Sequence, residues 1–274
     1  MKIKAFAFDM DGTLMDSKGY SPTKESIEAL REAHDKGYKI ILATGRPLCF
    51  ALPAAEEIGR VSYIISSNGS SIYNVEEKKI TEVSAIDKEL YKAIVEKAKE
   101  TNSYISVSTV KNEYREFYHP TDKDPKWLED FRFDGIDAPM EWFDEIIERE
   151  GVTQVSLKNT GGVIEDMAVE LRKRFGEDNS IHVANSIYLD VDPKGVSKLT
   201  GIQTVIDEMD IKMSEVMAFG DSGNDLKMIQ GAGYGICMGN GSKEAKEIAD
   251  EVIGDNDSDA IAKKIREVIS NDSK

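Results

Sequence analysis

The sequence predicts an α/β protein in which a parallel sheet is interrupted by an inserted α+β region. The first 67 residues alternate between apolar strands and amphipathic helices, the pattern changes from about residue 84, and the alternation returns after residue 186. Short strands separated by helices are typical of βαβ units. We therefore expect a core formed by residues 1–83 and 188–274 and an insert of residues 84–187.

The first half of the core reads strand, helix, strand, helix, strand. Residues 3–8 form an apolar strand, and TKESIEALREAHDK (23–36) has apolar residues three positions apart, as an amphipathic helix requires. YKIILAT (38–44) is a continuous apolar strand, followed by a helix over 48–58 and a strand over 62–67. Asn68-Gly69 is a strong hairpin signal, and SSIYN returns beyond it.

The insert mixes alternating strands with helices. A helix over 87–100 leads into the strand YISVSTV, then into a polar and aromatic stretch, and VTQVSLK (152–158) and IHVA flank a helix that ends near Phe175. The second half of the core begins with SIYLDVDPKGVSK (186–198), an apolar strand ending in charge. A helix over 198–209, the strand of EVMAFGDSGND, a short helix, the strand YGICM and two further helices follow.

Composition excludes several classes of protein. The net charge of −16 would repel nucleic acids and anionic membranes. Two cysteines supply neither a disulfide framework nor metal-ligand spacing, which indicates a reducing compartment. The N-terminal stretch MKIKAFAFDMDG does not resemble a signal peptide, and no apolar run is long enough to span a bilayer. We expect a cytoplasmic protein of unknown oligomeric state.

Two carboxylates end the first apolar strand, in the stretch FDMDGTLMDS. Asp9 and Asp11 would repel each other in a setting of low dielectric constant unless a cation or a reaction compensates them. Three other predicted strands also end in polar motifs, and in an open parallel sheet ligands bind outside the carboxyl ends of the strands. The four motifs are Asp9-x-Asp11-Gly-Thr, Ala-Thr44-Gly45-Arg46, Asp192-Pro-Lys194-Gly and Gly220-Asp221-Ser-Gly-Asn224-Asp225.

Two other interpretations of these motifs are weaker. A calcium-binding EF-hand loop needs Gly at its sixth position and Glu at its twelfth, whereas here Gly12 is fourth and Tyr20 is twelfth. Gly-Asp-Ser-Gly also occurs around the nucleophile of chymotrypsin-like proteases, which would make Ser222 the nucleophile. Those enzymes are all-β proteins with a catalytic triad, and the α/β pattern does not fit them.

Together, FDMDGTL, ATGR, DPKG and FGDSGND resemble the four motifs of the haloacid dehalogenase (HAD) superfamily of phosphatases and phosphotransferases, in order and across the whole chain. ISSNG, DPKGVSK and GDSGND further resemble its Cof-like branch, subfamily IIB. The resemblance implies a Rossmann-like parallel-sheet core with a C2-type cap inserted between the second and third motifs. It also implies a Mg²⁺-dependent phosphatase that forms an aspartyl-phosphate.

The resemblance further assigns roles to particular residues. Asp9 would be the nucleophile, and Asp11 would protonate the leaving group and later activate water. The implied sites are catalytic Asp9 and Asp11; phosphate-binding Met10, Thr44, Gly45, Lys194 and Asn224; metal-binding Asp9, Asp11 through its carbonyl, and Asp221; and supporting Asp225 and Arg46.

Some roles stay open at this stage. Arg46 could reach the substrate or pair with a surface acid, and Tyr114, Tyr118 and His119 of the insert could face the substrate or fill the core of the cap. The expected substrate is a small phosphorylated metabolite, with a sugar phosphate implied by the resemblance. A phosphotransferase that relocates phosphate on a sugar and a non-catalytic phosphometabolite-binding protein are the alternatives.

Overall fold

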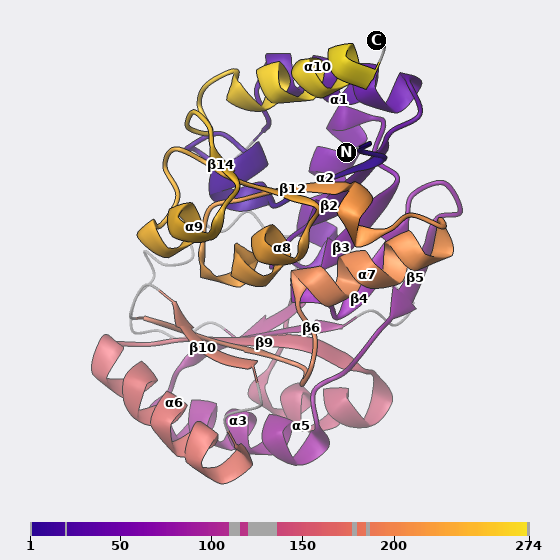
Figure 1. Ribbon diagram of the computed structural model, residues 1–274. Coiled ribbons are helices and arrows are strands. Elements are labelled where there is room, and N and C mark those ends of the chain that lie inside the picture. Colours follow the sequence, from indigo (N-terminus) through magenta and orange to yellow (C-terminus); the bar gives the residue numbers. More distant parts are fainter. Residues whose placement is uncertain are drawn as a thin grey trace. The chain divides into compact units, whose positions relative to one another are not determined.

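The structure, a computed structural model, describes residues 2–19, 21–109, 116–119, 136–176, 180–184 and 187–272. It divides into two compact units (Figure 1). The core unit combines Met1–Ile80 with Ser197–Lys274, and the insert unit is the single segment Thr81–Val196. The core unit is thus assembled from two stretches that lie far apart in the sequence.

The core unit contains a mainly parallel sheet with the strand order β14-β13-β12-β1-β2-β3-β4-β5 (Figure 1). Every neighbouring pair from β14 to β3 is parallel, and β3 and β4 form an antiparallel hairpin. The strands are β1 (Ala5–Phe8), β2 (Lys39–Ala43), β3 (Tyr63–Ser66), β4 (Ser71–Asn74), β5 (Lys79–Glu82), β12 (Val216–Gly220), β13 (Tyr234–Cys237) and β14 (Glu251–Val252).

Helices cover both faces of this sheet, so β1 is completely buried and consists of apolar residues throughout, as expected for a central parallel strand. Side chains of α7 pack against β1, β2 and β12 on one face. Tyr38, beside Phe6, donates a hydrogen bond to Asp272 of α10. The helices are α1 (Lys24–Asp35), α2 (Leu48–Ile58), α7 (Lys198–Glu208), α8 (Leu226–Gly231), α9 (Lys243–Ile248) and α10 (Ala260–Asp272).

The insert unit contains a second sheet with the strand order β10-β11-β9-β6-β7-β8. Its pairs are antiparallel except β7 with β8. The strands are β6 (Tyr104–Thr109), β7 (Glu116–His119), β8 (Ile136–Asp137), β9 (Val152–Lys158), β10 (Ser180–Ala184) and β11 (Tyr188–Asp192). The helices are α3 (Lys88–Thr101), α5 (Met140–Arg149) and α6 (Gly161–Phe175).

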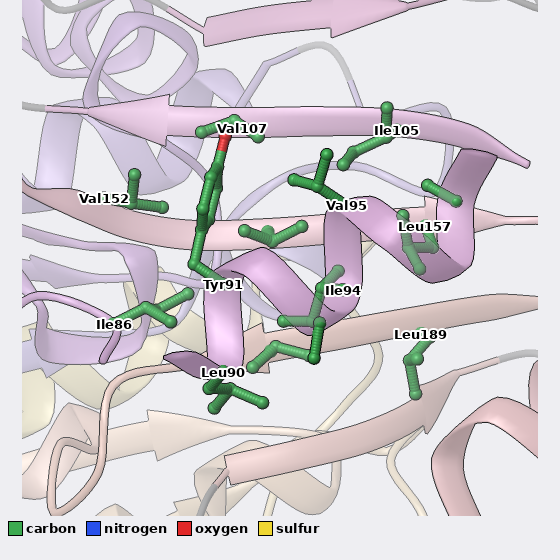
Figure 2. Close-up of a cluster of buried hydrophobic side chains, with 14 of the residues drawn as sticks. Ile86, Leu90, Tyr91, Ile94, Val95, Ile105, Val107, Val152, Leu157 and Leu189 are labelled. Carbon is green, nitrogen blue, oxygen red and sulfur yellow. The ribbon is translucent and has the colours of Figure 1, made fainter. Parts of the chain in front are cut away.

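The insert unit has its own hydrophobic core. Figure 2 shows side chains of α3, among them Tyr91 and Ile94, directed at strand residues such as Val107 and Leu157. The hydroxyl group of Tyr91 is buried and donates a hydrogen bond to the carbonyl oxygen of Phe143 at 2.7 Å. This separate core explains how the insert forms a compact unit of its own.

The structure corrects one sequence-based boundary. Residues 188–192, expected in the core, form β11 and pair with β9 and β10 of the insert unit. In this strand Leu189 and Val191 are buried, and the residues that alternate with them are polar or aromatic. Such alternation is typical of an antiparallel strand with one apolar face, whereas a buried parallel strand is apolar throughout. The insert therefore ends at Val196.

Candidate active site

Four adjacent strands of the core unit end at one edge of its sheet. In the order β12, β1, β2, β3 they are followed by Asp221, Asp9, Thr44 and Ser67. After β1 the chain makes a turn over Met10–Leu14, which is closed by a hydrogen bond from the N–H group of Met15 to the carbonyl oxygen of Met10. The sequence predicts that all four motifs meet at one edge; the parallel topology brings the first, second and fourth together there, whereas the strand before the third motif belongs to the insert unit.

Asp9 is held by a buried lysine. Nζ of Lys198 donates to Oδ1 of Asp9 at 2.5 Å and to Oδ1 of Asp225 at 2.7 Å. All three side chains are at most 5% exposed. Lys198 is the first residue of α7, which begins there because Ser197 and Thr200 cap it reciprocally. Because these side chains are buried, the charge-assisted hydrogen bonds between them fix the orientation of the Asp9 carboxylate.

Asp225 organises the loop that follows β12. Its Oδ2 accepts hydrogen bonds from the backbone N–H groups of Asp221 and Ser222, both at 3.0 Å, while its Oδ1 accepts from Lys198. Both oxygens are therefore engaged by groups of the protein. Asp225 thus connects Lys198 with the Asp221 loop, and the supporting role expected from the sequence stays a prediction.

Asp221 faces the turn that follows β1. Oγ1 of Thr13 donates to Oδ1 of Asp221 at 3.2 Å. Gly12 has a φ of +78°, and a Cβ atom built on it would lie 2.5 Å from Oδ2 of Asp221. A residue with a side chain would therefore be strained and would displace this carboxylate. Gly12 lets the backbone of the turn approach Asp221 closely.

In the part of the chain that the structure describes, three carboxylates of this edge lie near one buried ammonium group, that of Lys198. Oxygens of Asp9, Asp221 and Asp225 lie within 4.8 Å of one another, and three carboxylates against the one ammonium of Lys198 leave a charge of −2. Burial, with the neighbouring carboxylates, raises the pKa of Asp9 well above its usual value, although Lys198 opposes the rise. Burial and Asp225 likewise raise the pKa of Asp221.

These observations fit a divalent cation. Hard cations such as Mg²⁺ prefer carboxylate oxygens, and a charge of +2 would balance the residual −2. Since Asp225 already accepts four hydrogen bonds from protein groups, Asp9 and Asp221 are the carboxylates that remain for such an ion. Burial alone would lower the pKa of Lys198, but Asp225 and Asp9 outweigh it and raise that pKa, so the ammonium stays charged.

Asp11 is exposed, and an arginine holds it. Nε of Arg46 donates to Oδ2 of Asp11 at 2.7 Å, and Nη2 of Arg46 donates to Oδ1 of the same carboxylate and to the carbonyl oxygen of Gly19. This two-point contact fixes the plane of the Asp11 carboxylate. Of the two roles left open for Arg46, the structure has it paired with an acid, and that acid is itself a predicted site residue.

The second motif forms a tight turn after β2. Thr44 is fully buried, and its Oγ1 accepts a hydrogen bond from the N–H group of Arg46 at 3.0 Å. Asn224 lies across from this turn, and its Nδ2 donates to Oδ1 of Asn68 at 3.1 Å. Thr44, Gly45 and Asn224 therefore belong to the same edge of the core unit as Asp9.

Comparison with known proteins identifies the family. The family model of the haloacid dehalogenase-like hydrolases matches residues 6–265. The chain is 31% identical over 270 residues to 5-amino-6-(5-phospho-D-ribitylamino)uracil phosphatase YcsE of Bacillus subtilis, covering 96% of this chain and 95% of that protein. The chain belongs to the haloacid dehalogenase-like hydrolases.

Other relatives in this family agree. The chain is 27% identical to phosphoglycolate phosphatase of Methanothermobacter thermautotrophicus, over 96% of this chain and 98% of that protein. The solved structure of a HAD subclass IIB sugar phosphatase matches with a TM-score of 0.80 and 28% identity, over 96% of this chain and 98% of that chain. The protein is therefore a Cof-like HAD hydrolase, and it is a phosphoric monoester hydrolase. Within the described residues, no helix is both long and apolar enough to cross a membrane.

The lysine that contacts Asp9 is not the one expected from the sequence. Lys194 is exposed and belongs to the insert unit, four residues before the lysine that contacts Asp9. The cation that contacts Asp9 is thus Lys198, and the phosphate-binding role expected for Lys194 stays a prediction. Both lysines occur in DPKGVSK, and Lys198 stands at the start of a helix, where the helix dipole disfavours a cation. That unfavourable position was the signal in the sequence.

Sequence reasoning also missed two smaller contributors, Thr13 beside Asp221 and Asn68 beside Asn224. Three aromatic or imidazole candidates of the insert lie outside what can be described: Tyr114 falls outside the described residues, and for Tyr118 and His119 only the backbone in β7 is described.

Proposed function

We propose that the protein is a Mg²⁺-dependent phosphatase that hydrolyses small phosphorylated metabolites, sugar phosphates among them, through an aspartyl-phosphate on Asp9. The observation that carries this proposal is the buried contact of Asp9 with Lys198 beside a second, incompletely balanced carboxylate, Asp221. The exposed carboxylate of Asp11, two residues from Asp9, supplies the acid and base that hydrolysis needs.

In the first step, an oxygen of Asp9 attacks the phosphorus atom while the ester bond to the leaving oxygen breaks. Asp11 donates its proton to that oxygen, so an alcohol leaves and the phosphoryl group stays on Asp9. In the second step, Asp11 takes a proton from water as the water oxygen attacks the phosphorus atom. Inorganic phosphate leaves and the Asp9 carboxylate is restored.

The remaining residues bind and orient the phosphoryl group. Lys198 fixes the Asp9 carboxylate and adds positive charge beside the attacked phosphorus atom. The hydroxyl group of Thr44, the N–H groups of Met10 and Gly45, and the amide of Asn224 would bind phosphoryl oxygens. A Mg²⁺ ion held by Asp9, Asp221 and the Asp11 carbonyl would neutralise charge on the phosphoryl group. Arg46 would keep the Asp11 carboxylate in position between the two steps.

The names of similar proteins support a substrate with a short oxygen-rich carbon chain next to the phosphate. One relative is named for a ribityl phosphate, another for phosphoglycolate, and a structural neighbour is a sugar phosphatase. We therefore expect ribitol phosphate, pentose and hexose phosphates and phosphoglycolate to include substrates of this protein.

Phosphate release from p-nitrophenyl phosphate and from these esters, with Mg²⁺ or with EDTA, tests the proposal. The proposal expects release that needs Mg²⁺ and falls at least about 10³-fold in Asp9→Asn. Asp35→Asn, the same substitution at an exposed acid, is the control and is expected to match the wild type. Unchanged activity in Asp9→Asn would refute the nucleophile, and no release from any ester would refute the phosphatase. Phosphate that only changes position on a sugar would identify a phosphotransferase instead.

A further inference from the structure

The turn between β3 and β4, residues Ser67–Gly69, has an unusual backbone. Ser67 and Asn68 are consecutive non-glycine residues with φ of 46° and 54°. Side chains make this left-handed region unfavourable, by about 1–3 kcal/mol per residue, so such a conformation persists where surrounding contacts hold it. Asn tolerates it better than most residues. Several of the contacts that hold this turn come from residues of the candidate active site.

The backbone of the turn is bonded to the second motif on both sides of Gly45. The N–H group of Asn68 donates to the carbonyl oxygen of Thr44, and the N–H group of Ser67 donates to the carbonyl oxygen of Arg46, each at 3.0 Å. The left-handed conformation directs both N–H groups at this loop. The turn therefore fixes the backbone that presents the Thr44 hydroxyl and the Gly45 N–H group.

The same turn packs closely on the start of α7. A Cβ atom built on Gly69 would lie 2.4 Å from the carbonyl oxygen of Ser197, which precedes Lys198. Gly69 also has a φ of +109°. Glycine thus allows the turn to contact the residue next to the lysine that holds Asp9.

The side chain of Asn68 completes the connection by orienting Asn224. Oδ1 of Asn68 accepts from Nδ2 of Asn224, and Oγ of Ser222 donates to Oδ1 of Asn224 at 2.9 Å. Both ends of the Asn224 amide are therefore held. One of its two N–H bonds is used by Asn68, and the other makes no hydrogen bond to a described residue.

We propose that Asn68 is a positioning residue of the phosphate site. Its Oδ1 fixes the Asn224 amide so that the second N–H bond is available to a phosphoryl oxygen, and its backbone N–H group fixes Thr44. This inference rests on the proposed function, which assigns Asn224 and Thr44 to the phosphate. Asn68 acts through these residues and needs no contact of its own with the substrate.

Asn68→Gly tests the side chain alone, because glycine keeps the left-handed backbone at no steric cost. We expect kcat/KM for the best ester to fall about tenfold, the effect of one lost hydrogen bond that orients a binding group. Asn102→Gly is the matched control, since Asn102 is an exposed Asn of the insert unit with a similar φ of 49°. It should leave kcat/KM unchanged.

A double-mutant cycle separates positioning from a general structural effect. If Asn68 acts through Asn224, adding Asn68→Gly to Asn224→Ala lowers kcat/KM no further. Independent, multiplying effects of the two substitutions would overturn the inference, and so would wild-type kinetics in Asn68→Gly. Equal losses in Asn68→Gly and Asn102→Gly would also overturn it.

Binding of inorganic phosphate in the presence of Mg²⁺, measured by calorimetry, keeps the inference separate from the proposed function. If the wild type hydrolyses no ester, the phosphatase proposal fails, and the same cycle read in phosphate affinity decides the role of Asn68. Weaker binding in Asn68→Gly that does not add to Asn224→Ala supports it. Unchanged affinity, or no phosphate binding by the wild type, overturns it.

Discussion

Lys198→Met would remove the ammonium group between Asp9 and Asp225 and keep a side chain of similar length. Lys198 is 1% exposed, and the two carboxylates it contacts are 5% and 0% exposed. Neither carboxylate could find a partner in solvent without opening the edge of the sheet. The substitution thus leaves two buried charges unpaired.

The magnitude follows from this burial. Breaking a buried ion pair by removing one partner costs about 3–5 kcal/mol. Since Lys198 forms ion pairs with two carboxylates, we expect a loss of stability at the upper end of that range. At 2–4 °C per kcal/mol for a protein of this size class, the melting temperature should fall by about 10 °C or more. Phosphatase activity should fall with it, because the Asp9 carboxylate loses the contact that orients it.

Thermal unfolding followed by circular dichroism, with EDTA present, measures the predicted decrease in melting temperature. Lys194→Met is the matched control because that lysine is exposed, and it should shift the melting temperature by no more than about 2 °C. Lys198→Met combined with Asp225→Asn removes one of the unpaired charges and should recover part of the lost stability without recovering activity. Equal melting temperatures for Lys198→Met and Lys194→Met would refute the reasoning.

Three further predictions concern single side chains. Gly12→Ala places a Cβ atom against the carboxylate of Asp221, at a φ of +78° that disfavours a side chain. The Mg²⁺ concentration for half-maximal activity should therefore rise at least about tenfold. An unchanged concentration would contradict the close approach of the turn to Asp221. Tyr91→Phe leaves the carbonyl of Phe143 without its partner and should lower the unfolding free energy by about 1 kcal/mol with unchanged kcat, as urea titration and kinetics can check. Burial raises the pKa of Asp190, so the ionised carboxylate destabilises the folded protein above that raised pKa. Asp190→Asn should therefore raise the melting temperature at pH 7. This increase in melting temperature should shrink as the pH falls through the raised pKa and vanish below the usual pKa of 3.8. An increase that does not depend on pH would refute the destabilising effect of the ionised carboxylate.

The parallel core and most of its site could be predicted from the sequence. Continuous apolar runs such as YKIILAT indicate central parallel strands, and the polar residues behind them meet at one edge because parallel strands share a direction. Asp9, Thr44 and Asp221 follow strands directly, so their places depend on strand assignment alone. No side-chain direction had to be known for these three.

Residues further from a strand end were harder to place. Lys194 and Lys198 are only four positions apart in the sequence. Lys198 contacts Asp9 because α7 begins there. Tyr188–Asp192 resembled a core strand because its neighbours in space are not encoded locally. Asn68 was recognised as a turn residue, but its bond to Asn224 spans 156 positions of sequence and follows from tertiary structure.

The division of the core unit into two chain segments has a consequence for biogenesis. β1 pairs with β2 nearby and with β12, more than 200 residues later, while the insert unit is one continuous segment with its own hydrophobic core. Domains generally fold as they are synthesised, from the N-terminus onward. The insert unit can therefore fold before α7 and β12 have joined the core unit. Asp9 contacts Lys198, almost 190 residues further along the chain, and the loop of Asp221 follows β12, so the candidate site can be complete only after the second segment of the core unit has docked on the first.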